Sequence, residues 1–236
     1  MVIAVCRFPA TNNESDVLSV LKNDLHTEAE LIPHFDSDKI YDSKFTGIII
    51  PGGFSYGDYL RPGAIASATD LMNAIKVKNR EEGCPILGIC NGFQILTESK
   101  MLPGVLLKNK KNKFISTWIY VKSNNSINPL LTGLKNKILH LPIAHFDGRY
   151  WLPKKDLEQV VNNNQVLFNY SSVIGELNNE SNPNGSIMNI AGISNENYTV
   201  FGLMPHPERA SRILLSSIDG LLILKNFLNL FSYISV

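Results

Sequence analysis

The sequence predicts an α/β fold with an open, mostly parallel central sheet and helices on both faces. Short apolar, β-branched runs alternate with stretches whose apolar residues recur at helical spacing. This alternation is typical of parallel sheets that are covered on both faces. A hydrophobic share of 44% over 236 residues also supplies enough apolar side chains for a packed core. Residues 1–236 are expected to form one domain, because no Pro/Gly/Ser-rich linker or internal repeat divides them.

In the first half, the predicted strands and helices alternate. Compact apolar runs predict strands over 2–8, 29–35, 45–50 and 85–89. Apolar residues at helical spacing predict a helix over 14–25. Pro62 is predicted to open a second helix, because proline suits the first helical turn, and 93–98 starts a third.

The second half contains more Asn, Lys, Ser and Gly, which predicts short strands joined by loops. The strand candidates are 114–121, 137–141, 165–170, 187–193 and 200–204. The apolar stretch from 213 to the C-terminus contains Asp219 and Lys225. It is therefore predicted as an amphipathic helix docked on the core, since a membrane span needs roughly 18 uninterrupted apolar residues.

Charge and cysteine content exclude several classes of protein. A formal net charge of +1 provides no basic surface for nucleic acid or for an anionic membrane. Three cysteines are an odd and sparse set, which is a poor disulfide framework and suits a reducing compartment. The N-terminus has no basic region before its short apolar run, so no signal peptide is predicted. We expect a cytoplasmic protein.

Cys90 lies in the most informative stretch, Gly88-Ile-Cys-Asn-Gly92, between an apolar strand and a predicted helix. A nucleophile flanked by glycines in this context sits on a sharp turn at the carboxyl end of the strand. The helix N-terminus favours a thiolate, and the backbone N–H of Asn91 would face an oxyanion on a substrate held there. The alternative is an ordinary buried cysteine, which is the simpler interpretation for Cys6 and Cys84.

A nucleophilic thiol needs a proton acceptor, and His206 is the best candidate among the five histidines. It lies in Met204-Pro-His-Pro-Glu-Arg209, where two prolines favour an extended chain. Residues two apart in an extended chain project to the same side, so Glu208 can orient the imidazole as the third member of a triad does. The alternative is a loop that prolines merely stiffen.

The turn Pro51-Gly52-Gly53 ends another predicted strand and brings backbone N–H groups to the same edge of the sheet. Gly53 could supply a second oxyanion donor beside Asn91, and a plain turn is the alternative. Neither a dinucleotide fingerprint nor a Walker A pattern is present. No grouping of His, Cys and carboxylates has metal-ligand spacing, so no metal site is predicted.

Together, 88–94 (GICNGFQ) and 204–209 (MPHPER) resemble the class I (triad) glutamine amidotransferases, whose fold is flavodoxin-like. Three further segments narrow the resemblance to glutaminase subunits of phosphoribosylformylglycinamidine synthases: 51–64 (PGGFSYGDYLRPGA), 142–150 (PIAHFDGRY) and 182–186 (NPNGS). The resemblance covers nearly the whole chain, and its motifs are collectively very specific.

The resemblance implies that Cys90 forms a thioester with glutamine, that His206 moves the proton and that Glu208 holds His206. It implies an oxyanion hole made by the backbone N–H groups of Gly53 and Asn91. The residues it assigns to glutamine binding are Gly52, Gln94, His145 and Arg149. One departure affects this last set. The family usually has His-Gly-Glu-Gly-Arg-Phe at 145–150, and a phenylalanine at 146 fits a positive φ less well than glycine does.

The resemblance also implies a division of labour. This chain carries no cofactor, and ATP and magnesium are expected on a large synthetase subunit that works with a small third subunit. Ammonia passes to the synthetase, which converts phosphoribosylformylglycinamide to the amidine in purine synthesis. Two other classes stay open: a cysteine hydrolase acting on esters or peptides, against which Gln94 and the His-Pro-Glu pair argue, and a non-catalytic support for the synthetase, against which the intact triad argues.

Overall fold

The computed structural model describes residues 2–124 and 126–230, and it is built around one sheet of nine strands. In order across the sheet these are β2 (Glu28–Pro33), β1 (Val2–Arg7), β3 (Phe45–Ile50), β4 (Ile86–Ile89), β11 (Val200–Leu203), β10 (Ile190–Ser194), β9 (Val166–Ser171), β6 (Ile115–Ser123) and β7 (Ile138–His145). A separate two-stranded sheet pairs β5 (Val105–Leu107) with β8 (Arg149–Trp151).

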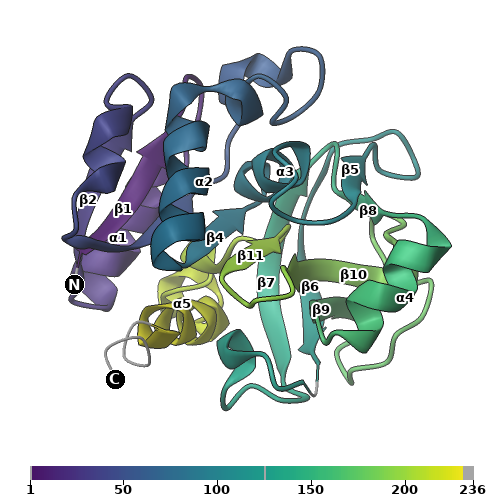
Figure 1. Ribbon diagram of the computed structural model, residues 1–236. Coiled ribbons are helices and arrows are strands. Elements are labelled where there is room, and N and C mark those ends of the chain that lie inside the picture. Colours follow the sequence, from purple (N-terminus) through teal and green to yellow (C-terminus); the bar gives the residue numbers. More distant parts are fainter. Residues whose placement is uncertain (1, 125, 231–236) are drawn as a thin grey trace.

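The five strands from β2 to β11 run parallel, and the four beyond them pair antiparallel. Figure 1 shows the N-terminal strands on one flank and the green strands of the second half on the other. Helices α1 (Glu14–Ser19), α2 (Asp70–Glu82), α3 (Asn91–Glu98), α4 (Lys154–Asn162) and α5 (Asp219–Asn229) accompany them. The predicted α/β class is confirmed, and the antiparallel half is an addition to it.

The central parallel strands β1, β3, β4 and β11 are buried on both faces, which explains their continuous apolar runs, whereas the edge strand β2 has exposed residues. Every residue from Val2 to Cys6 is buried, as is every residue of β4, and in β3 only Thr46 is partly exposed. These strands sit between helices and neighbouring strands, so neither face of the parallel half needs polar side chains. The core runs along these strands and continues into the antiparallel half, where Val121, Leu141 and Phe168 are buried.

The structure differs from the predicted elements in several places. Helix α2 begins at Asp70 and not at Pro62, because Thr69 is extended and its hydroxyl accepts the hydrogen bond of the Met72 N–H at 3.3 Å, which caps the helix. Residues 187–189, expected in a strand, form a 3₁₀ turn with Met188 at φ 48°. Helix α4, with its polar sequence, was not predicted.

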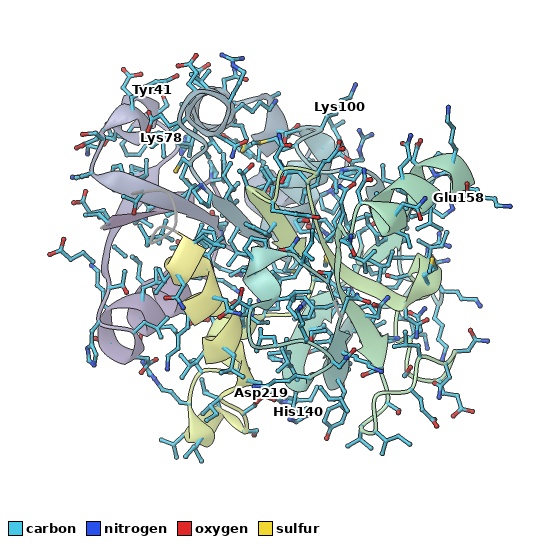
Figure 2. The ribbon with its side chains drawn as sticks, turned by 60° about the horizontal axis from the view of Figure 1, so that its bottom comes forward. Tyr41, Lys78, Lys100, His140, Glu158 and Asp219 are labelled. Carbon is cyan, nitrogen blue, oxygen red and sulfur yellow. The ribbon has the colours of Figure 1, made fainter. Side chains whose placement is uncertain are left out.

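The C-terminal helix α5 begins at Asp219, after a 3₁₀ turn over Ile213–Leu215, so the helix predicted from 213 starts six residues later. The Asp219 carboxylate accepts a hydrogen bond of 2.7 Å from the His140 N–H of β7, and Figure 2 shows the two residues together. Residues 231–236 of the predicted helix lie outside the described residues. Over the two described ranges, no helix is both long and apolar enough to cross a bilayer.

Four chain segments meet at one edge of the parallel half of the sheet. Strands β1, β3, β4 and β11 are consecutive neighbours and run in the same direction, so their carboxyl ends share that edge. The segments that follow these strands are 8–13, 51–58, 90–91 and 204–209. Open α/β sheets place their ligand sites at this edge.

Candidate active site

Cys90 sits on a strained turn between β4 and α3. Its φ of 50° and ψ of −103° lie where side chains are rarely accommodated. Glycines on both sides permit the turn: a Cβ at Gly92 would lie 2.0 Å from the Ile50 carbonyl oxygen, and one at Gly88 would lie 2.5 Å from Leu96. The predicted elbow is confirmed, and it places the Cys90 Sγ 3.7 Å from the Ala144 carbonyl oxygen of β7.

The other two cysteines are buried in the core and remain thiols. Burial raises the pKa of Cys84 to about 12, with the charge of Lys78 opposing the rise. Burial raises the pKa of Cys6 further still. Since the thiolate is the nucleophilic form, neither side chain suits nucleophilic chemistry near neutral pH.

His206 and Glu208 form a buried pair, with 2.7 Å between the imidazole Nδ1 and the carboxylate Oε1. Burial opposes charge on both groups, but the charges of Glu208 and Cys90 raise the pKa of His206 above its ordinary value. The His206 charge and the hydrogen bond from Asn13 lower the pKa of Glu208 despite its burial. No nitrogen or oxygen atom within the described residues bonds His206 Nε2, and the ring has a hydrogen bond with the Cys90 side chain.

Gly52 lies beside both the Cys90 side chain and the His206 imidazole. A Cβ built on Gly52 would lie 2.8 Å from His206 Cε1 and 3.4 Å from the Cys90 Cβ. The thiol and the imidazole therefore flank the same glycine, and the Cys90 charge contributes to the raised pKa of His206. Any side chain at position 52 would collide with the ring.

The two backbone N–H groups expected to bind an oxyanion are those of Gly53 and Asn91. Gly53 has a φ of 142°, and a Cβ there would lie 2.7 Å from the Thr11 Cα and the Asn12 backbone nitrogen. Asn91 is the first residue of α3, and the N–H groups of a helix's first turn have no partner within the helix. Neither N–H donates a hydrogen bond within the described part of the chain.

Gln94 is held by its neighbours. Its Oε1 accepts a hydrogen bond of 2.8 Å from the Asn91 side chain, and its Nε2 donates to the Asp147 carbonyl at 2.6 Å. The Asn91 Oδ1 in turn accepts from the Ser55 N–H at 3.0 Å. These amides join the 51–58 loop, the elbow and the 145–150 segment into one wall.

His145 is buried at the end of β7, with its Nδ1 3.1 Å from the Asn109 Oδ1. Burial, together with the charge of His206, lowers the pKa of His145 to about 3, so this ring is neutral at physiological pH. Arg149 lies at the rim, where its Nε donates to the Lys108 carbonyl at 3.0 Å. No hydrogen bond joins Arg149 to the triad within the described residues.

The substitution at Phe146 causes no backbone strain, because its φ is not positive. Its carbonyl accepts the Asn109 N–H at 2.9 Å, and its ring lies under the Lys108 ammonium group at 5.8 Å. The glycine that the segment requires is Gly148, where a Cβ would lie 2.2 Å from the His145 ring.

The 182–186 segment supports this wall from behind. Asn184 is fully buried and donates to the Gly148 carbonyl at 2.8 Å, and the Ser186 hydroxyl accepts from the Tyr150 N–H at 3.0 Å. These hydrogen bonds hold residues 148–150 in place.

Two carboxylates stand beside the mouth of the site. Partial burial and the nearby Asp147 charge raise the pKa of Asp58 to about 6. Burial also raises the pKa of Asp147, against the effect of Lys108. Among the residues described, no three His, Cys, Asp or Glu side chains are grouped as metal ligands would be.

Asn13 and Asn109 are site residues that sequence reasoning missed. Asn13 contacts both His206 and Glu208, and Asn109 holds His145 and the Gly148 N–H. For Asn13 a signal was present: the polar run 11–13 (TNN) lies in the segment that follows the buried strand β1. Asn109 lies in a loop after β5 and carried no comparable signal.

Comparison with known proteins places this geometry in a family. Residues 1–221 match the CobB/CobQ-like glutamine amidotransferase domain. The chain is 44% identical over 230 residues to the phosphoribosylformylglycinamidine synthase subunit PurQ of Methanosarcina barkeri, covering 97% of each chain. It is 46% identical over 229 residues to that of Sulfurimonas denitrificans, covering 97% of this chain and 99% of the relative. The chain belongs to the PurQ family of glutamine amidotransferases.

Solved structures agree with PurQ membership. A chain in the structure of PurLQS from Thermotoga maritima superposes with a TM-score of 0.82 at 36% identity, covering 97% of this chain and 98% of that one. Another glutamine amidotransferase from Thermotoga maritima shares the fold, with a TM-score of 0.57 at 15% identity, covering 100% of this chain and 99% of that one. The resemblance inferred from the motifs is confirmed.

Proposed function

We propose that this chain is the glutaminase subunit of a phosphoribosylformylglycinamidine synthase, which hydrolyses L-glutamine to glutamate and ammonia. The observation that carries the proposal is the arrangement at the sheet edge. A cysteine on a strained elbow has a hydrogen bond with a buried imidazole whose Nδ1 is held by Glu208 at 2.7 Å. This is the geometry of an activated nucleophile, its base and the group that orients the base.

In the acylation half, the Cys90 sulfur attacks the side-chain amide carbon of glutamine, and His206 Nε2 accepts the thiol proton. The backbone N–H groups of Gly53 and Asn91 bind the oxygen that becomes negative. The carbon–nitrogen bond then breaks, and His206 returns the proton to the leaving nitrogen. The products are ammonia and a γ-glutamyl thioester on Cys90.

In the deacylation half, His206 takes a proton from water, and the oxygen attacks the thioester carbon. The carbon–sulfur bond breaks, the imidazolium reprotonates the sulfur, and glutamate leaves. Glu208 remains ionised throughout, which its lowered pKa favours, and stabilises the imidazolium in both halves.

We assign glutamine binding to the walls formed by Gly52, Gln94, His145 and Arg149. Gly52 leaves room for the substrate beside the imidazole. Gln94 acts by holding the Asp147 backbone, since both ends of its amide are already bonded. His145, neutral at physiological pH, forms part of the wall without adding a positive charge beside His206.

The proposed partners are a large synthetase subunit that binds ATP and magnesium and a small third subunit. The Thermotoga maritima assembly named PurLQS supports such a complex. Ammonia passes to the synthetase, which converts phosphoribosylformylglycinamide to the amidine. We place this reaction in the cytoplasm, where three free thiols remain reduced, and infer that residues 1–236 act as one domain.

The test replaces Cys90 in the reconstituted complex. C90S should lower glutamine-dependent synthesis by about a thousandfold or more, because a hydroxyl is a far weaker nucleophile here, while ammonium-dependent synthesis stays at the wild-type rate. C84A, which alters a buried cysteine of the core, is the matched control and should retain both activities. Glutamine-dependent synthesis by C90S, or loss of both activities with the complex intact, would contradict the proposal.

A further inference from the structure

Asn13 occupies the N-cap position of α1, yet its side chain makes no capping hydrogen bond. Asparagine is among the residues that helices prefer at this position, where its side chain normally accepts a hydrogen bond from the first turn. Here the side chain is turned inward and is 2% exposed. The backbone N–H of Asn13 donates to the Gly52 carbonyl at 3.3 Å, which ties the residue to the active-site turn.

The side chain of Asn13 reaches the buried acid–base pair. Its Nδ2 lies 3.0 Å from the Glu208 Oε1 and 3.0 Å from the His206 Nδ1. Its Oδ1 accepts a hydrogen bond of 3.0 Å from Arg209 Nη2. Because arginine can only donate, this contact fixes which end of the amide faces outward, so the NH₂ group faces the pair.

The proton arrangement follows from these contacts. The His206 Nδ1 carries its proton toward the Glu208 Oε1 at 2.7 Å, so Nδ1 cannot also accept a hydrogen bond from Asn13. The Asn13 NH₂ therefore donates to the Glu208 Oε1, which receives two hydrogen bonds. This stabilises the ionised carboxylate, keeps the proton on Nδ1 and leaves Nε2 as the acceptor for the Cys90 proton.

We propose that Asn13 is a positioning residue of the active site, which holds Glu208 ionised and His206 in the tautomer that accepts a proton at Nε2. The inference rests on the proposed glutaminase function. It assigns Asn13 a role through Glu208 and His206, without contact to the substrate. Arg209, paired with Asp16 at 3.2 Å, holds the amide from the outer side.

The test compares N13D and N13A with N12A in the full complex. N13D preserves the shape of the side chain and its bond to Arg209, but it replaces the donor by a carboxylate oxygen facing Glu208. Asn12 is the adjacent asparagine and is exposed, so N12A is the matched control. Glutamine hydrolysis is measured as kcat and KM, and folding is checked by circular dichroism.

A hydrogen bond to a charged group contributes enough that its loss should lower kcat about 10- to 100-fold, with KM changed less than about threefold. N12A should match the wild type. N13D should also shift the pH profile of Cys90 alkylation by iodoacetamide upward, because an added negative charge disfavours loss of the thiol proton. The titratable groups that face His206 are Cys90, Glu208 and His145, and all three are unchanged in these variants.

N13D with the kcat and alkylation profile of N12A would overturn the inference. If N13D does not fold, N13A decides the same comparison, since it removes the amide without adding charge. Wild type and N12A that both fail to hydrolyse glutamine in an intact complex would instead overturn the proposed function. If the wild type and N12A hydrolyse glutamine and the Asn13 variants hydrolyse it equally fast, only the role of Asn13 is overturned.

Discussion

Gly52 shows how closely single residues constrain this site. A Cβ built on Gly52 would lie 2.8 Å from the His206 ring and 3.1 Å from the Asn13 amide nitrogen. G52A should therefore displace the imidazole and lower kcat for glutamine at least about tenfold, at an overpacking cost of about 1–3 kcal/mol in the free energy of unfolding. Steady-state kinetics and urea unfolding measure the two effects.

G83A is the control for this substitution. Gly83 has a φ of 66° and no atom within 4 Å of its Cβ position, so alanine there should cost about 1–2 kcal/mol of stability through backbone strain alone. It should leave kcat unchanged. A G52A variant that is destabilised but as active as G83A would contradict the account of the 51–53 turn.

His145 gives stability a defined pH dependence. Its pKa is lowered to about 3 in the folded chain, below an ordinary value of 6.5, so between these values the unfolded chain binds a proton that the folded chain does not. Stability should fall as pH drops through this window, by up to about 1.4 kcal/mol per pH unit from this side chain.

H145Q should therefore flatten the decline in unfolding free energy from about pH 6 to about pH 4, since glutamine does not titrate. Urea unfolding at several pH values measures the slope. A slope equal to that of the wild type in H145Q would show that His145 is not the buried neutral group described above.

Local motifs were sufficient to identify Cys90, His206 and Glu208 as candidates, because the elbow and the two prolines dictate local backbone geometry. Asn13 could not be assigned in the same way. It is 193 residues away from His206 in sequence, and their contact depends on the pairing of β1, β3, β4 and β11. A residue whose contacts depend on the pairing of distant strands can be identified only when the order of strands in the sheet is known.

Among the elements, buried strands were predicted best. The run 45–50 coincides with β3, and the predicted 85–89 differs from β4 by one residue, because a buried strand is continuously apolar and a turn residue ends it. Helix α2 starts later than predicted, because the Thr69 hydroxyl, and not Pro62, caps the first turn of the helix. Helix α4 has one buried residue, Val160, so its apolar pattern was weak.

The antiparallel half of the sheet could not be predicted from strand patterns. Strands β9 and β10 are largely buried, like the central parallel strands. A continuous apolar run does not indicate whether the strand pairs parallel or antiparallel with its neighbour. Strand β7, and β6 from Ile119 onward, alternate between buried and partly exposed residues, as a half-covered antiparallel pair does. The role of this pair is to bring Ala144 and His145 against the elbow.

For the whole molecule, the site is a property of one sheet edge. The segments after β1, β3, β4 and β11 supply Asn13, the glycine turn, Cys90 and the His206–Glu208 pair. The antiparallel half adds the opposite wall through 144–149. We expect this edge to make Cys90, and neither Cys6 nor Cys84, the nucleophile toward glutamine.

Labelling with a diazoketone analogue of glutamine tests this claim most directly. The complex is treated with the analogue, digested, and mapped by mass spectrometry. We expect one thioether per chain on the Cys90 peptide, formed in step with loss of glutamine-dependent activity and prevented by excess glutamine. Inactivation with the label on Cys6 or Cys84, or with no label on Cys90, would contradict this claim.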